Sequence, residues 1–243
     1  MFKAFLKLPL LLLCFLLTMS SLASAPAASF FDLVFDLDWT LVYPVDKNVN
    51  AETIVLPQGR FHLADGVPET LLKLHRQGHR ISIFSGGVVV RNRALAEILV
   101  HKIHALGGTD FSFYKVLNFE DLSQRPGASK DSKFADRWMK DLRKVNTDLR
   151  RVVLIDDMIK FSPAGQGKNM YWLAKTYNFH KAFDRHAKGD FDPPTKTAWR
   201  TERNKIPLFF ENFQKAQKHF SNEEVLPALQ DLSLGKSICP RIF

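Results

Sequence analysis

Cysteine is nearly absent from this chain of 243 residues, which holds only two. Cys14 falls in a leader-like segment at the N-terminus, and Cys239 stands close to the C-terminus. Once the leader is removed, no intramolecular disulfide can form, so disulfides do not hold this fold together. The fold must rest on an apolar core, and hydrophobic residues, at 46% of the chain, are enough to fill one.

The chain also lacks an apolar run long enough to cross a membrane. Its leader has an apolar block over residues 8–17, well short of the roughly 20 residues that a bilayer span needs. Lysines precede this block, and small residues follow it up to Ala25. This layout predicts a secretory signal peptide over residues 1–25, cleaved somewhere between 23 and 28, and therefore export to the periplasm or the medium. An uncleaved leader is the alternative, and we expect no other contact with a membrane.

Strand-like and helix-like segments alternate along the chain. Apolar runs that end in polar residues predict buried strands, at 31–36, 80–85, 111–119 and 150–156. Apolar residues at helical spacing predict helices, at 67–77, 88–106, 129–146 and 206–220. The alternation predicts a three-layer α/β/α fold, in which a mostly parallel sheet is covered on both faces. We expect this core over 29–180, and a basic C-terminal extension over 181–243 that packs on it.

Three of the expected strands end in chemically useful residues. The run FFDLVFDLDWT places Asp36 and Asp38 after the first strand, Ser85 ends the second, and Asp156 and Asp157 end the last. Because the carboxyl ends of parallel strands meet at one edge of a sheet, we expect these side chains to share a pocket. So many carboxylates together favour Mg²⁺, and without a cation their mutual repulsion would be strongly unfavourable.

The motif DLDWTLV resembles the first motif of the haloacid dehalogenase (HAD) superfamily, DxDxT followed by apolar residues. Ser85, Lys140 and the aspartate pair stand where the later motifs of that superfamily would. More narrowly, KDLRKVNTDLRRVVLIDD, residues 140–157, resembles the lysine-to-aspartate segment of the FCP/SCP-type (NLI-interacting-factor-like) phosphatases, and FSPAGQGKNM resembles the stretch after it. The resemblance covers roughly residues 31–176 and implies a HAD-like Rossmannoid fold with a minimal cap.

The resemblance implies a role for each aspartate. Asp36 would be the nucleophile that forms an aspartyl-phosphate, and Asp38 the acid that protonates the leaving oxygen and then activates water. Mg²⁺ would be held by the side chains of Asp36 and Asp157 and by the backbone carbonyl of Asp38. Asp156 would support that metal site.

The remaining motif residues are expected to bind the substrate. Ser85 would hydrogen-bond a phosphoryl oxygen with the help of the amides of Gly86 and Gly87, and Lys140 would neutralise charge on the transferring phosphoryl group. Thr40 would orient the loop that follows the first strand.

Each of these assignments has a structural alternative. The strand-end residues are also common in turns and helix caps. The role of Lys140 has two rivals on the same predicted helix or just before it, Lys130 and Lys133. The spacing of Lys140 from Asp156 matches the family and favours Lys140.

We therefore expect an exported, Mg²⁺-dependent phosphomonoester phosphatase acting on a phosphorylated protein or a small phosphomonoester, with no nucleic-acid partner. The gaps between motifs leave no room for a large helical cap, so the site should be open, although a hairpin near 45–62 could cover it. One alternative is a broad-specificity secreted acid phosphatase of class B or C type. Another is a module that binds phosphate without turnover. The family's intracellular polymerase substrate does not carry over to an exported chain.

Overall fold

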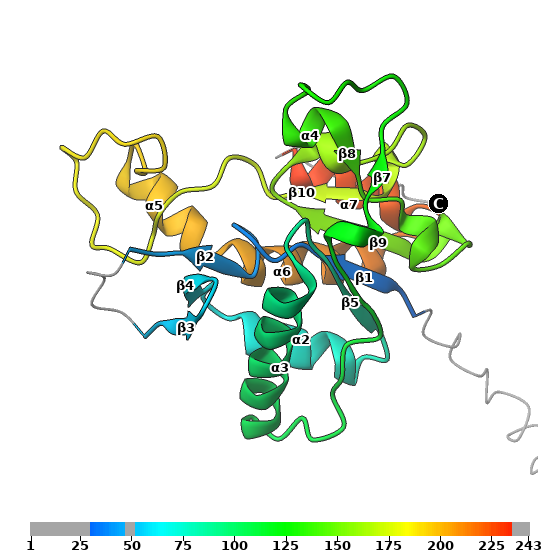
Figure 1. Cartoon of the computed structure of the whole chain (residues 1–243). Coiled ribbons are helices and arrows are strands. Elements are labelled where there is room, and N and C mark those ends of the chain that lie inside the picture. The colour runs from blue at the N-terminus through cyan, green and yellow to red at the C-terminus, as the bar shows by residue number, and fades with distance from the viewer. Residues whose placement is uncertain (1–29, 47–51, 235–243) are drawn as a thin grey trace, which may run out of the picture.

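The first strand of the chain lies at the centre of a five-stranded parallel sheet (Figure 1). β1 (Asp32–Phe35) pairs with β5 (Arg80–Phe84) on one side and with β9 (Val152–Asp156) on the other. β6 (Val116–Leu117) and β10 (Met170–Trp172) complete the order β10-β9-β1-β5-β6. The expected α/β fold with a central parallel sheet is confirmed.

The structure is a computed structural model and describes residues 30–46 and 52–234. The expected signal peptide over residues 1–25 lies outside these ranges, so export stays a prediction. None of the helices in the described ranges combines the length and the apolarity that crossing a bilayer requires.

Long helices cover one face of the central sheet. They are α2 (Val67–Arg76), α3 (Val89–Ala105), α6 (Lys205–His219) and α7 (Val225–Ser233). Strand alternation sends Leu33 and Phe35 of β1 toward this face, where they join one large apolar core with Phe209 and Phe213 of α6. The helices expected at 67–77, 88–106 and 206–220 are confirmed by α2, α3 and α6.

Short, irregular elements cover the opposite face, where Val34 and Leu154 point into a smaller core with Leu122 and Leu142. In chain order they are η2 (Phe119–Asp121), β7 (Ser123–Gln124), α4 (Phe134–Arg137), β8 (Trp138–Met139), η3 (Leu142–Lys144) and η4 (Leu149–Arg151), where η marks a 3₁₀ helix. Figure 1 shows α4, β7 and β8 on the other side of the sheet from α2 and α3. The second covering layer is therefore built of turns and a two-stranded ribbon.

The prediction of one helix over 129–146 is wrong, because the backbone groups of this segment form hydrogen bonds with other parts of the chain. Within this range only α4 is α-helical and only η3 forms a 3₁₀ turn, while Trp138 pairs with Gln124 in the β7–β8 ribbon. The amide of Lys140 donates to the carbonyl of Phe161 at 2.9 Å, and the Asp141 side chain accepts from the amide of Arg143. Such side-chain bonds compete with helix formation. The strand expected at 111–119 shrinks to the two residues of β6.

A small antiparallel sheet occupies the interval between the first motif and α2. It consists of β2 (Val42–Pro44), β3 (Ile54–Leu56) and β4 (Gly59–Leu63) in the order β2-β4-β3. The described residues of this interval contain no helix, which agrees with the expected minimal cap. α5 (Lys196–Arg203) lies beside β2, and the hydroxyl of Tyr43 donates to Glu202 at 2.5 Å.

Candidate active site

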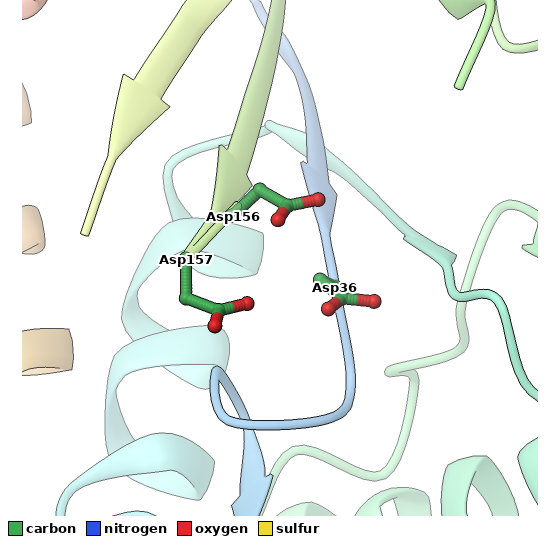
Figure 2. Close-up of side chains that lie close together, drawn as sticks. All are labelled: Asp36, Asp156 and Asp157. Atoms are coloured by element: carbon green, nitrogen blue, oxygen red, sulfur yellow. The ribbon is translucent and has the colours of Figure 1, made fainter. Parts of the chain in front are cut away.

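Three aspartates meet where β1 and β9 end. The register of the two strands places Phe35 beside Ile155, so Asp36 and Asp156 follow side by side, with Asp157 next. One oxygen from each carboxylate lies within 4.8 Å of the others. Figure 2 shows the three side chains around a common space at the strand ends. The structure thus brings together three of the four aspartates that the sequence indicated as metal ligands.

Lys140 lies between two of these aspartates. Its Nζ is 2.8 Å from Oδ1 of Asp36 and 2.6 Å from Oδ2 of Asp156, and the side chain has no exposed surface. Burial by itself would lower the pKa of Lys140, but the charges of Asp156 and Asp36 outweigh it and raise the pKa. The two rivals for its role, Lys130 and Lys133, are both exposed. Lys140 is therefore the lysine that the fold places in this cluster.

Asp156 differs from its neighbours in having both oxygens engaged. Oδ2 accepts from Lys140, and Oδ1 accepts from the amide of Met158 at 2.7 Å. Asp156 thus fixes the lysine and the loop after β9. The side chains of Asp36 and Asp157 are better suited to bind a metal.

The cluster carries more negative charge than Lys140 balances. Burial raises the pKa of Asp36 to about 7, with Asp156 and Asp38 adding to the rise and Lys140 opposing it. Burial, then Asp156 and Asp36, raises the pKa of Asp157 to about 8. A divalent cation would hold both groups ionised, and carboxylate oxygens are the ligands that Mg²⁺ prefers. The donor set therefore fits the metal expected from the sequence.

Asp38 lies in a tight turn beyond the cluster and points to a different partner. Its Oδ2 is 2.5 Å from a guanidinium nitrogen of Arg91 and 3.5 Å from the hydroxyl of Ser85. The turn is closed by the amide of Thr40 donating to the carbonyl of Leu37. The buried hydroxyl of Thr40 has no hydrogen-bond partner among the described residues. The side chain of Asp38 is 31% exposed, against 7% for that of Asp36, so it is the more accessible acid.

The loop after β5 places Ser85 and the two glycines at the same edge. The amide of Gly87 donates to the Ser85 hydroxyl at 3.3 Å, and the buried Asn92 donates to the carbonyl of Gly87 at 2.9 Å. A Cβ on Gly87 would lie 1.8 Å from the guanidinium of Arg91 and 2.5 Å from Oδ1 of Asn92, so a side chain there would displace both groups. The loop that was expected to bind phosphate is thus held in place from α3.

Sequence reasoning missed Arg91 and Asn92. A cation in the first turn of a helix opposes the helix dipole, and this unfavourable position was the available signal for Arg91. The signal was incomplete, because Arg93, two residues further along the same helix, is exposed. Only the packing of α3 against the β5 loop separates the two arginines.

Comparisons with protein-family models and with curated proteins find no match. Among solved structures, a variant of the fission yeast RNA polymerase II CTD phosphatase Fcp1 bound to beryllium fluoride matches with a TM-score of 0.42 and 15% identity, over 86% of this chain and 64% of that chain. A structure of Fcp1 described as an essential RNA polymerase II CTD phosphatase matches with a TM-score of 0.39 and 17% identity, over 86% and 63%. This chain spans less than two thirds of either structure. These neighbours are phosphatases of the type that the motifs resemble, but at TM-scores below 0.5 we base the function on the geometry of the site.

Proposed function

We propose that this chain is a Mg²⁺-dependent phosphomonoester phosphatase in which Asp36 is the nucleophile. The observation that carries the proposal is the buried Lys140, held between Asp36 and Asp156 beside the further carboxylate of Asp157. A purely structural ion pair would balance its charges, whereas this edge keeps an excess of carboxylates. Such an excess is suited to a metal and a phosphoryl group.

The reaction needs two proton transfers, and one acid can make both. An oxygen of Asp36 attacks phosphorus, the bond from phosphorus to the ester oxygen breaks, and Asp38 gives its proton to that oxygen. Asp38 then takes a proton from water, and the water oxygen attacks phosphorus. The bond to Asp36 breaks, and inorganic phosphate leaves. The greater exposure of Asp38 suits an acid that must exchange protons with the leaving group and with water.

The other side chains would position the phosphoryl group. Lys140 keeps Asp36 oriented and neutralises charge. Arg91 binds Asp38 in the free chain, and a phosphate dianion is a natural alternative partner for its guanidinium, which would release the acid. Bound Mg²⁺, held by Asp36, Asp157 and the carbonyl of Asp38, would supply further charge neutralisation.

The test is hydrolysis of p-nitrophenyl phosphate by the purified chain. Turnover should require added Mg²⁺, stop with EDTA, and be abolished in Asp36→Asn with cooperative unfolding retained. Asp110→Asn, which changes an exposed aspartate outside the cluster, is the matched control and should stay active. Metal-independent turnover or an active Asp36→Asn would overturn the proposal. Mg²⁺-dependent phosphate binding without any turnover would favour the non-catalytic module.

The substrate class is also a proposal. The small β2-β4-β3 sheet, with no helical cap in the described part of the interval, leaves the approach open enough for a phosphorylated protein side chain. A panel of phosphopeptides, nucleotides and sugar phosphates separates a protein phosphatase from a broad-specificity acid phosphatase. The latter would hydrolyse the small esters at least as fast as the peptides.

A further inference from the structure

Four aromatic rings form a cluster on the irregular face of the sheet, beside the loop after β5. Phe119 and Phe134 stack with ring centroids 6.1 Å apart, and Phe161 meets Phe134 edge to face at 5.9 Å. Trp138 packs against Phe119 at 5.3 Å. The neighbours on either side hold the ring of Phe134 in place.

Phe134 touches the candidate phosphate-binding loop directly. A Cβ on Gly86 would lie 3.0 Å from Cε1 of the Phe134 ring, so a side chain at this position would push the ring away from the loop. On its other side, the Phe161 ring centroid is 4.8 Å from Nζ of Lys140. Phe134 therefore lies beside the candidate site, between the loop of Ser85 and Gly86 and the ring of Phe161 next to Lys140.

The ring is well exposed for a residue with so many aromatic contacts. Phe134 is 45% exposed and Phe119 is 36% exposed. Met158 and Ile159, which directly follow the aspartate pair, are exposed as well, and α4 packs against η5 (Ile159–Phe161). Single exposed apolar side chains are common, but a contiguous group beside a site indicates a surface that binds something apolar.

We propose that Phe134 determines the specificity of this site by binding the ring of an aryl phosphate, of which the phosphotyrosyl side chain is the protein form. This inference rests on the proposed function, since it assigns the phosphate to the loop of Ser85. Because Phe134 contacts Gly86 itself, the ring it binds must be attached directly to the ester oxygen. A base carried on a ribose would lie farther from the phosphate. Edge-to-face and offset contacts between rings then add to burial of the apolar surface.

The test measures binding, so that it does not depend on turnover. Asp36→Asn, with Mg²⁺ present, is titrated with phenyl phosphate and with methyl phosphate in a calorimeter. Phenyl phosphate should bind about tenfold more tightly, and adding Phe134→Ala should bring the ratio of the two affinities close to one. Tyr114→Ala is the matched control. Tyr114 is 46% exposed, but it precedes β6 and so lies toward the amino ends of the parallel strands, whereas the site lies at their carboxyl ends. That variant should keep the preference.

Further titrations distinguish the ligands that could supply the ring, and further variants distinguish the causes of a lost preference for phenyl phosphate. A phosphotyrosine peptide should bind like phenyl phosphate, and adenosine monophosphate should bind like methyl phosphate. Phe134→Tyr should retain the preference, and Phe134→Leu should lose most of it while keeping an apolar side chain and the fold. The inference is overturned by equal binding of the two esters, by a preference that survives Phe134→Ala, or by equally tight binding of the nucleotide. A chain that prefers phenyl phosphate in this way but hydrolyses no ester overturns only the proposed function.

Discussion

The two faces of the central sheet are built on different principles. The helical face is a continuous aromatic core, in which Phe35, Phe209, Phe213 and Phe31 meet in a chain of ring contacts. The irregular face has a smaller core and relies on hydrogen bonds from side chains to backbone, such as Gln166 accepting from the amide of Leu142. Yet the irregular face supplies Lys140 and Phe134 to the candidate site.

The difference shows that the fold distributes stability and chemistry unevenly, although α3 of the helical face also supplies Arg91 to the candidate site. A long helix satisfies its own backbone and can offer only side chains at helical spacing. The segment around Lys140 leaves helical geometry, bonds to Phe161 through its backbone, and so directs the lysine into the cluster. Segments of this kind, supported by a regular scaffold, are where functional residues concentrate.

Replacing Lys140 should have the largest effect on activity. Lys140→Met removes the cation between two buried carboxylates, so we expect kcat/KM for p-nitrophenyl phosphate to fall about 10³-fold. The free energy of unfolding should fall by roughly 3 kcal/mol, because the carboxylates lose their partner. Lys130→Met, on the same segment but exposed, should change neither quantity appreciably. Equal losses in the two variants would remove the distinction between the lysines.

Truncating one buried side chain in each core should affect stability and KM differently on the two faces. Phe209→Ala, in the helical face, should lower the free energy of unfolding by about 4 kcal/mol in urea, with the KM of the remaining folded protein unchanged. Leu142→Ala, in the irregular face, should cost about 2 to 3 kcal/mol but raise KM, because Leu142 lies two residues from Lys140. If both variants raised KM equally, the core of the irregular face would have no special part in positioning the candidate site.

A buried histidine of the helical face, His79, should make the free energy of unfolding depend on pH. Burial lowers the pKa of His79 to about 4, although a hydrogen bond with Gln217 opposes the shift, and its Nδ1 accepts from the amide of Phe31. The unfolded chain binds this proton near pH 6.5 and the folded chain only near 4, so stability is full above about 6.5 and falls as the pH drops toward 4. The contribution is on the order of 3 kcal/mol, since each unit of difference in pKa corresponds to about 1.4 kcal/mol.

Urea unfolding at several pH values measures this contribution. His79→Leu should be less stable than the unaltered chain at pH 7 but should lose less stability between pH 6.5 and 4. The same slope in both proteins would assign the dependence to carboxylates instead.

Many strands and helices of the fold could be predicted from local sequence patterns. The strand ends at Asp36, Ser85 and Asp156, and the helices α2, α3 and α6, were predictable because apolar periodicity and glycine stops are local signals. The helix expected over 129–146 had an equally good pattern and was wrong, since Trp138 and Lys140 find their partners on distant segments. Arg91 was missed because its partner, Asp38, lies far along the chain.

The sequence by itself determined the alternating α/β order, the aspartates and serine that stand at the strand ends, and the lysine 16 residues before Asp156. Only the tertiary structure decided how they are used. It buried Lys140 between Asp36 and Asp156, left Lys130 and Lys133 in solvent, and set Phe134 against Gly86 instead of on a buried helix face. The physical reason is that periodicity reports which side chains avoid water, whereas charge pairing and ring contacts depend on segments that meet only after the sheet has formed.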